Sequence, residues 1–373
     1  MSNYLKIVNK NKNKTIFVFS SANVPEGKFT GSKIFSEDWN VILINTKDND
    51  WYLRDVLEGI SRLSSLEHLV ERYRKMGPVV FFGSSMGACG ALYYGSRCNA
   101  DYVFSFSPEL KLGIRGGFFE RECKIRDTLE FKIDYIDLIK DTDSKIYFFC
   151  GENNIVDSSS LSLVPDQDNL FKFSLINAEH VVVKEINDIF GLSYFISSIV
   201  SGGGEVDFQY LITGELLKYP CVIESLYQFD IEKNYESILN VDLNIKSKEV
   251  KSYVFRRLAL YYSQQQLHEQ ALMFARDSYL LNANCGKNAM MYSKILFRNK
   301  KYNKVLSILS PVTLQASVEL GKPYFQAYFI ILDCCKKLKY KKEYFFYYYK
   351  LSKIVPINGA LAERFSKYDQ ELL

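Results

Sequence analysis

The chain has 373 residues, of which 47% are hydrophobic and 24% are charged, and its formal net charge is only +4. This composition, with 27 Tyr and 27 Phe, supplies apolar material for packed cores and excludes an intrinsically disordered protein. No run of about 18 apolar residues and no apolar leader segment occur, so we expect neither a bilayer-spanning helix nor a signal peptide. The expectation is therefore a cytoplasmic protein of two domains.

Short apolar runs alternate with helical patterns over the first 200 residues. Strands are expected at residues 5–8, 15–19, 41–45, 78–82, 102–106, 145–150 and 171–176. Helices are expected at residues 56–76, after residue 87, at 134–140 and at 182–200. Strands separated by helices predict an α/β fold, in which a mostly parallel sheet is flanked by helices on both faces.

A Gly-rich segment at residues 201–205 reads Ser-Gly-Gly-Gly-Glu and has the composition of a flexible linker. The residues after it are almost purely helical in pattern. We therefore predict an α/β domain at 1–200, a linker at 201–205 and an all-α domain at 206–373.

The all-α domain contains a repeat of helical patterns. Phe255, Leu258 and Tyr262 fall at the spacing of a tetratricopeptide helix pair, and a second copy aligns from Gly286 with a period of about 34 residues. Each pair buries its apolar stripe only by stacking on its neighbours, so we expect a helical-repeat domain resembling tetratricopeptide repeats.

The charged and aromatic residues of the all-α domain indicate which binding partners it could have. From Val206 onward, 24 Lys and Arg stand against 16 Asp and Glu. This excess is either a solvated helical surface or a basic face for an acidic partner, such as an anionic polymer or a membrane surface. Aromatic residues at 344–349 favour self-association or a protein partner. No base-reading motif occurs, so nucleic acid is not an expected partner.

The eight cysteines form no C-x-x-C pair, which gives no sign of a zinc site or a thioredoxin-like motif. Several lie in apolar runs, and we expect buried, reduced thiols. Neither a metal nor a bound cofactor is predicted.

A catalytic motif is indicated at residues 83–87. They read Gly-Ser-Ser-Met-Gly and fit the pattern G-x-S-x-G. The pentapeptide follows an apolar strand and precedes a helix of small residues, which is the context of a nucleophile elbow. Small flanking residues let such a sharp turn close against its neighbours. Ser85 is therefore the predicted nucleophile.

A serine nucleophile needs a base, and the chain has three histidines. His68 lies inside the helix expected at 56–76, and His268 lies in the helical repeats, so both are expected to be structural or exposed. His180 follows the last predicted strand and precedes the last helix of the first half. In folds with a nucleophile elbow the base lies there, after Ser and acid in chain order, so His180 is the predicted base.

The acid should lie on the loop after the strand at 145–150 and fix the tautomer of the imidazole. The acid often comes three residues after the glycine, which here is Asn154, a residue without charge. Asp157 is the predicted acid. Glu152 is the next alternative, and an uncharged Asn154 is a further one; Asp157 could also serve only as a helix cap.

Two backbone donors are needed to stabilise a tetrahedral oxyanion. One is expected from Met86, which follows the nucleophile. The other is expected from the loop after the strand at 15–19, where Ser21 and Ala22 are the two alternatives.

The motif at 83–87, the loop at 151–157 and His180 together resemble the α/β-hydrolase superfamily over about residues 1–200. Three shorter stretches, at 19–22, 83–92 and 107–112, are similar to bacterial capsular-polysaccharide O-acetyltransferases. That resemblance implies transfer of an acetyl group from acetyl-CoA to a sugar hydroxyl through an acetyl-Ser85 intermediate. The helical-repeat domain is not part of it.

A basic and aromatic segment begins at Lys111, where this fold often inserts a lid. Lys111, Arg115 and Arg121 could bind CoA phosphates or an anionic glycan, or could belong to a solvated loop. Three functions remain open: a serine-dependent acyltransferase that acts on a surface glycan before export, a cytoplasmic serine esterase, and a scaffold whose hydrolase-like half is catalytically weak.

Overall fold

The computed structural model describes residues 3–8, 11–31, 33–35, 38–53, 63–123, 134–202, 213–315 and 322–354. The chain divides into two compact units, Met1–Asn234 and Tyr235–Leu373. This division comes later in the chain than the predicted linker, whose residues 203–205 lie outside the described ranges. The described residues 213–234 therefore belong to the same unit as the sheet.

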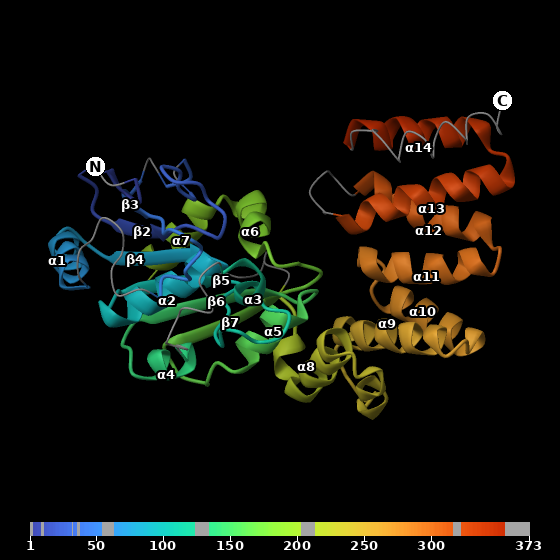
Figure 1. The fold of residues 1–373 in the computed structure, drawn as a ribbon, viewed down its shortest axis with the longest axis horizontal. Coiled ribbons are helices and arrows are strands. Elements are labelled where there is room, and N and C mark those ends of the chain that lie inside the picture. Colours follow the sequence, from blue (N-terminus) through green and yellow to red (C-terminus); the bar gives the residue numbers. More distant parts are fainter. Residues whose placement is uncertain are drawn as a thin grey trace. The chain divides into compact units, whose positions relative to one another are not determined.

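The first unit is built on a seven-stranded sheet in the order β1-β3-β2-β4-β5-β6-β7 (Figure 1). The strands are β1 (Leu5–Val8), β2 (Thr15–Phe19), β3 (Asn40–Ile44), β4 (Val79–Ser84), β5 (Tyr102–Phe106), β6 (Lys145–Gly151) and β7 (Leu170–Leu175). All neighbouring pairs are parallel except β1 with β3, which is antiparallel at the edge. The predicted α/β class with a mostly parallel sheet is confirmed.

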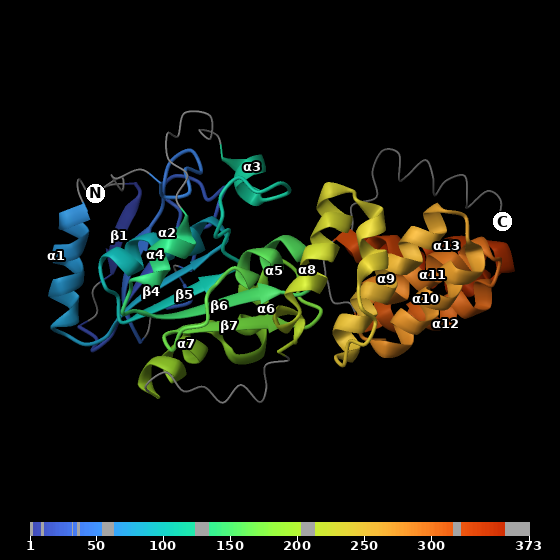
Figure 2. The ribbon, with the colours of Figure 1, turned by 90° about the horizontal axis from the view of Figure 1, so that it is seen from below.

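Each face of the sheet packs against its own helices. Successive side chains of a strand point to opposite faces, so Phe17 and Phe81 belong to one buried cluster and Ile16 and Val80 to the other. The helices on the first face are α1 (Leu63–Arg74), α2 (Met86–Arg97) and α4 (Tyr135–Lys140), and those on the second are α6 (Val182–Phe190) and α7 (Leu192–Ser201) (Figure 2). Burial on both faces explains why these strands read as continuous apolar runs.

The single helix predicted at residues 182–200 is wrong, because two helices occupy this stretch. Gly191 ends α6 with a φ of 75°, and its N–H donates to the Asn187 carbonyl oxygen at 2.8 Å. The Asn187 side chain then accepts the N–H of Leu192 at 3.1 Å, at the start of α7. The apolar pattern is continuous across this break, which is why periodicity alone does not reveal it.

Shorter elements surround the carboxyl ends of the strands and complete the first unit. They are α3 (Phe118–Glu122), α5 (Ile155–Ser162), the 3-10 helix η3 (Leu216–Lys218), α8 (Pro220–Tyr227) and the π-helix η4 (Gln228–Glu232). The helix predicted at 56–76 is described only as α1, because residues 54–62 lie outside the described ranges.

The second unit consists of helices that pack successively in pairs (Figure 1). Its elements are the 3-10 helix η5 (Tyr235–Asn240), α9 (Lys248–Gln264), α10 (His268–Leu281), α11 (Gly286–Arg298), α12 (Tyr302–Gln315), α13 (Lys322–Leu338) and α14 (Lys341–Ile354). The core of this unit includes the buried residues Ala259, Ala271 and Ala289. Their small side chains allow neighbouring helices to approach one another closely. The helical class of this region is confirmed, whereas its assignment to tetratricopeptide repeats stays a prediction.

All eight cysteines are free thiols, and all except Cys221 are buried. Across the described ranges, none of the helices combines the length and the apolar character needed to cross a bilayer.

Candidate active site

The segment predicted as a nucleophile elbow forms a sharp turn between β4 and α2. Ser85 has a φ of 57° and a ψ of −123°, a strained backbone for a residue with a side chain. A Cβ atom added to Gly83 would lie 1.9 Å from the Gly87 carbonyl oxygen, and one added to Gly87 would lie 2.2 Å from that of Phe19. The two glycines are therefore needed for the turn to close on itself and on the end of β2.

His180 lies where the sequence places it, between β7 and α6, and its ring reaches Ser85. The distance from His180 Nε2 to Ser85 Oγ is 2.9 Å. His180 Nδ1 lies 2.9 Å from Asp157 Oδ2 and 3.1 Å from Oδ1. A carboxylate only accepts hydrogen bonds, so Nδ1 carries the proton and Nε2 is free to accept the proton of the serine hydroxyl.

The loop after β6 shows why Asp157, three residues beyond Asn154, is the residue that reaches His180. Asn154 is the N-cap of α5, and its side chain accepts the N–H groups of Val156 and Asp157. The capping role considered for Asp157 thus falls to Asn154, and the buried Asp157 carboxylate turns toward His180. Glu152 faces elsewhere, because its Oε1 accepts from Ser174 Oγ at 2.9 Å and from the backbone N–H of Leu216 at 2.8 Å.

Backbone contacts that the sequence does not reveal hold the loops of the acid and the histidine together. Ser107, at the end of β5, donates its hydroxyl to the His180 carbonyl oxygen at 2.7 Å. The N–H of Asn153 donates to the Ala178 carbonyl oxygen at 2.9 Å. A Cβ atom at Gly151 would lie 2.1 Å from the Glu179 carbonyl oxygen, so glycine is required for this approach.

The oxyanion donors predicted from the loop after β2 can be compared by their hydrogen bonds. The N–H of Ser21 donates to Thr30 Oγ1 at 3.2 Å, and the N–H of Asn23 donates to Asn49 Oδ1 at 2.8 Å. Ser21 also donates its hydroxyl to the Ser84 carbonyl oxygen at 3.0 Å, which joins this loop to the elbow. Of the two predicted alternatives, Ala22 is therefore favoured over Ser21, together with Met86 at the first position of α2.

An aromatic side chain covers the histidine. The ring of Phe118, the first residue of α3, stacks on the imidazole of His180 with a centroid distance of 4.0 Å. The Arg121 guanidinium lies over the same phenyl ring at 4.3 Å. The sequence predicts an aromatic segment here as a candidate lid, but not the stack of Phe118 on His180, because the contact joins segments more than 60 residues apart in sequence.

The three basic residues considered for CoA or glycan binding are all exposed. Arg121 is tied to the site through Phe118, and its Nε donates to the Gly117 carbonyl oxygen at 3.3 Å. Arg115 accepts the Tyr227 hydroxyl on its carbonyl oxygen at 2.8 Å, which anchors this segment to α8. The backbone of Lys111 pairs with that of Asp134 in an isolated antiparallel β-bridge.

A second carboxyl group, Glu109, lies beside the triad residues. Its Oε2 accepts the N–H of Phe119 at 2.8 Å. Burial raises the pKa of this carboxyl from 4.5 to about 7, and the backbone N–H groups of Phe119, Gly113 and Phe118 act in the opposite direction. The nearby charge of Asp157 raises this pKa further.

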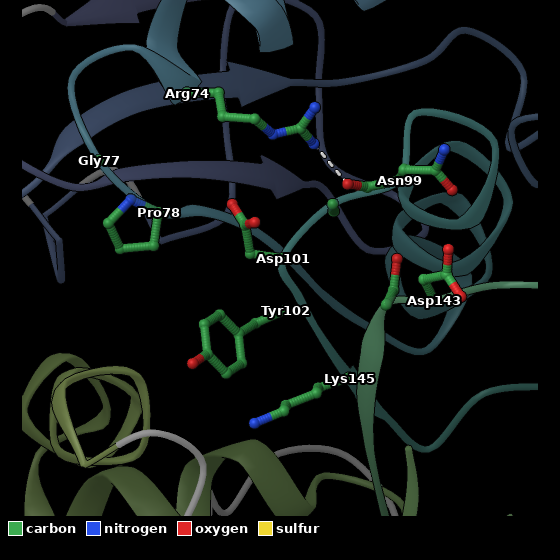
Figure 3. Close-up of a pocket in the computed structure, with 10 residues that line it drawn as sticks. Arg74, Gly77, Pro78, Asn99, Asp101, Tyr102, Asp143 and Lys145 are labelled. Atoms are coloured by element: carbon green, nitrogen blue, oxygen red, sulfur yellow. Dashed lines mark hydrogen bonds between the residues drawn. The ribbon is translucent and has the colours of Figure 1, made fainter.

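A small cavity of about 10 Å³ lies at these residues, lined by Ser85, Asp157, His180, Trp51, Glu109, Phe118, Ser107, Pro108, Val156 and Ser160. A much larger hollow of about 520 Å³ lies at the amino ends of β4, β5 and β6 (Figure 3). There Arg74 donates to the carbonyl oxygens of Asn99 and Cys98, and Asp101 accepts the N–H of Val79. Since Ser85 lies at the carboxyl ends of the strands, where parallel sheets hold their active sites, we place the site at the small cavity.

The other two histidines, His68 and His268, are exposed on helices α1 and α10. In the described parts of the chain, no group of three or more His, Cys, Asp or Glu side chains is arranged to hold a metal ion.

No protein-family model and no curated protein matches the chain. The capsule O-acetyltransferase of Neisseria meningitidis serogroup A is similar over 54% of this chain and 93% of that chain, with 15% identity and a TM-score of 0.38. A mutant of that enzyme in complex with CoA is similar over 46% of this chain and 83% of its own, with 17% identity and a TM-score of 0.33. An α/β serine hydrolase without a lid from Xanthomonas campestris is similar over 57% of this chain and 89% of its own, with 8% identity and a TM-score of 0.30.

At TM-scores of 0.30 to 0.38 these similarities say nothing about the chemistry of the chain, which depends on its own residues. The mostly parallel sheet, with a serine on a strained turn after a central strand and a histidine after the last strand, is an α/β-hydrolase-like arrangement.

Proposed function

We propose that the chain is a serine-dependent acyltransferase, with Ser85 as nucleophile, His180 as base and Asp157 as the group that orients the base. The observation that carries this proposal is the continuous hydrogen-bond chain from Ser85 Oγ through the imidazole to the buried Asp157 carboxylate. Nucleophile, base and orienting acid within hydrogen-bond reach are the requirement for activating a serine.

In the proposed reaction, Ser85 Oγ attacks the carbonyl carbon of an acetyl thioester while its proton passes to His180 Nε2. The N–H groups of Met86 and Ala22 stabilise the oxyanion. The thiolate leaves with the proton from His180, and acetyl-Ser85 remains. An acceptor hydroxyl then gives its proton to His180 and attacks the acetyl ester. His180 passes this proton to Ser85 Oγ as the ester bond breaks, which regenerates Ser85 and the neutral imidazole and forms the acetylated acceptor.

Acetyl-CoA is the proposed donor, and a hydroxyl group of a bacterial surface polysaccharide is the proposed acceptor. Both come from the resemblance to capsular O-acetyltransferases and from the chemistry of this site. Arg121 supports the donor assignment, because an exposed guanidinium next to the covered histidine is suited to binding phosphate. We propose that Lys111 and Arg115, which are basic residues of the same segment, also bind the donor.

Transfer is favoured over hydrolysis because the site is closely covered. Phe118 stacks on His180 and covers the imidazole that would have to activate an attacking water. An acyl-enzyme that survives until the acceptor arrives needs such exclusion of water. A serine esterase with the same triad is the alternative, and it predicts that water competes well with added hydroxyl acceptors.

The test is release of free thiol from acetyl-CoA by the purified protein and by Ser85→Ala. We expect release by the wild type, stimulated by hydroxyl acceptors, and none by the variant. Thiol release that persists in Ser85→Ala would refute the assignment of the nucleophile. No release by either protein, together with activity on simple acetate esters, would favour the esterase.

For the helical unit we propose a role in self-association or protein binding. On α14, Phe345, Phe346 and Tyr349 are 43%, 48% and 61% exposed, respectively, which is unusual for aromatic side chains. Light scattering after gel filtration should show an oligomer or a partner complex that replacing these three residues by serine abolishes; an unchanged mass would contradict the proposal.

A further inference from the structure

The small cavity beside Ser85 contains two buried polar atoms that the reaction above does not use. Trp51 is fully buried, and Glu109 is 7% exposed. Within the described ranges, the structure shows no hydrogen-bond partner for Trp51 Nε1 or for Glu109 Oε1. Both residues line the same cavity as Ser85 and His180. Because leaving a buried donor or acceptor unpaired is costly, such atoms in a native protein call for a ligand or an ordered water.

Both side chains contact the same residue of the covering segment, Phe119. The Trp51 ring meets the Phe119 ring edge-to-face at 5.3 Å. Glu109 Oε2 accepts the backbone N–H of the same Phe119 at 2.8 Å, which leaves Oε1 as the second oxygen. The carboxyl group and the indole therefore share Phe119 as a neighbour, and both line the cavity that contains the reacting groups.

Neighbouring residues also hold the backbone of Trp51 and of Glu109 in place. Trp51 has a φ of 55°, a rare conformation for a bulky residue. The next residue, Tyr52, secures it by donating its hydroxyl to the Ser20 carbonyl oxygen at 2.9 Å. Glu109 is held from the side of α2, where Cys89 Sγ contacts its carbonyl oxygen at 3.5 Å. A preorganised pair of this kind is suited to recognition rather than to adaptable packing.

We propose that Trp51 and Glu109 form an acceptor subsite, in which Trp51 Nε1–H donates to, and Glu109 Oε1 accepts from, one hydroxyl group of the acyl acceptor. A hydroxyl is the group that both accepts and donates, so it satisfies both atoms at once. This inference rests on the proposed acyl transfer and adds the substrate class: the acceptor carries a second hydroxyl close to the one that attacks acetyl-Ser85. Diols, polyols and sugars fit, whereas monohydric alcohols do not.

The size of the cavity agrees with one bound hydroxyl. Its volume of about 10 Å³ is close to that of one water-sized group.

The experiment uses 4-nitrophenyl acetate as donor and ethanol, ethylene glycol or glycerol as acceptor. The burst of nitrophenolate measures acetyl-enzyme formation, and the ratio of transfer to hydrolysis measures acceptor recognition. We expect ethylene glycol and glycerol to be at least about tenfold better acceptors than ethanol in the wild type. Trp51→Phe and Glu109→Gln should each reduce this preference about tenfold or more, with the preference of each variant measured relative to its own hydrolysis of the acetyl-enzyme.

Two matched controls are available in the chain. Trp39→Phe removes another buried indole N–H, from the cluster on the opposite face of the sheet. Glu120→Gln removes an exposed carboxylate from the same covering segment as Phe119. Both should keep the wild-type preference for diols, which separates loss of recognition from general loss of stability or charge.

The possible outcomes decide between the claims. A normal burst without any preference for diols in the wild type would overturn the subsite alone, and the cavity would then hold only water. A preference that Trp51→Phe and Glu109→Gln leave unchanged would also overturn it. Absence of any Ser85-dependent release of nitrophenolate, together with absence of Ser85-dependent thiol release from acetyl-CoA, would refute the proposed acyl transfer and the subsite with it. The comparison of ethanol with ethylene glycol needs no variant, so a poorly folded variant does not remove the test.

Discussion

Replacing Asp157 by Asn should remove most of the activity while leaving the fold intact. The carboxylate is buried, and Oδ2 lies 2.9 Å from His180 Nδ1. During the reaction the imidazole becomes positively charged. At an effective dielectric constant of about 20, two unit charges at this separation attract by roughly 5–6 kcal/mol. Loss of that attraction, and of the preferred tautomer, corresponds to a fall in kcat of about 10⁴-fold.

The assay is thiol release from acetyl-CoA, with the midpoint of thermal unfolding measured on the same samples. Glu152→Gln is the matched control, because Glu152 is the other buried acid of this loop and bonds to Ser174 and Leu216 instead of His180. Its effect should fall on stability and leave kcat within about tenfold of the wild type. The reasoning fails if Asp157→Asn keeps more than about a tenth of the activity, or if a folded Glu152→Gln loses as much.

Three further changes test the surroundings of the triad. Gly87→Ala puts a Cβ atom 2.2 Å from the Phe19 carbonyl oxygen, and denaturant unfolding should show a loss of about 3 kcal/mol; an equally stable variant would show that the elbow tolerates a side chain. Phe118→Ala uncovers His180, so hydrolysis of the acetyl-enzyme should rise several-fold relative to transfer, and an unchanged ratio would contradict the covering role. Burial raises the pKa of Glu109 from 4.5 to about 7, so its contribution to stability is fully present below pH 4.5 and is lost as the pH rises through about 7. The stability of Glu109→Gln relative to the wild type should therefore increase over this interval by up to about 3 kcal/mol, and a difference independent of pH would refute the buried carboxyl as its cause.

Local patterns were sufficient to predict the sheet and the elbow. Every predicted strand is present with its bounds within two residues, because strands buried on both faces leave unbroken apolar runs. The break at Gly191 and the division after Asn234 escaped prediction. The first is a single left-handed residue in an apolar pattern, and the second depends on residues 213–234 packing with the sheet rather than on linker composition.

The site was predictable only where chain order restricts the choice. Three histidines and a fixed order left His180 as the base, and the structure places it on Ser85. Asp157 lay among several polar residues of one loop, and the capping role of Asn154 explains why Asp157 rather than residue 154 faces His180. Phe118 could not be predicted, because its contact with His180 depends on how the covering segment packs.

The central claim is tested most directly by locating the acetyl group during turnover. Protein mixed with acetyl-CoA, quenched in acid within the first turnovers and digested, is analysed by mass spectrometry of the peptide that contains Ser85. The account predicts one added acetyl group on Ser85 that disappears when a polyol acceptor is supplied before the quench. Turnover without any acetylated Ser85, or an acetyl group on another residue that disappears at the same rate, would contradict it.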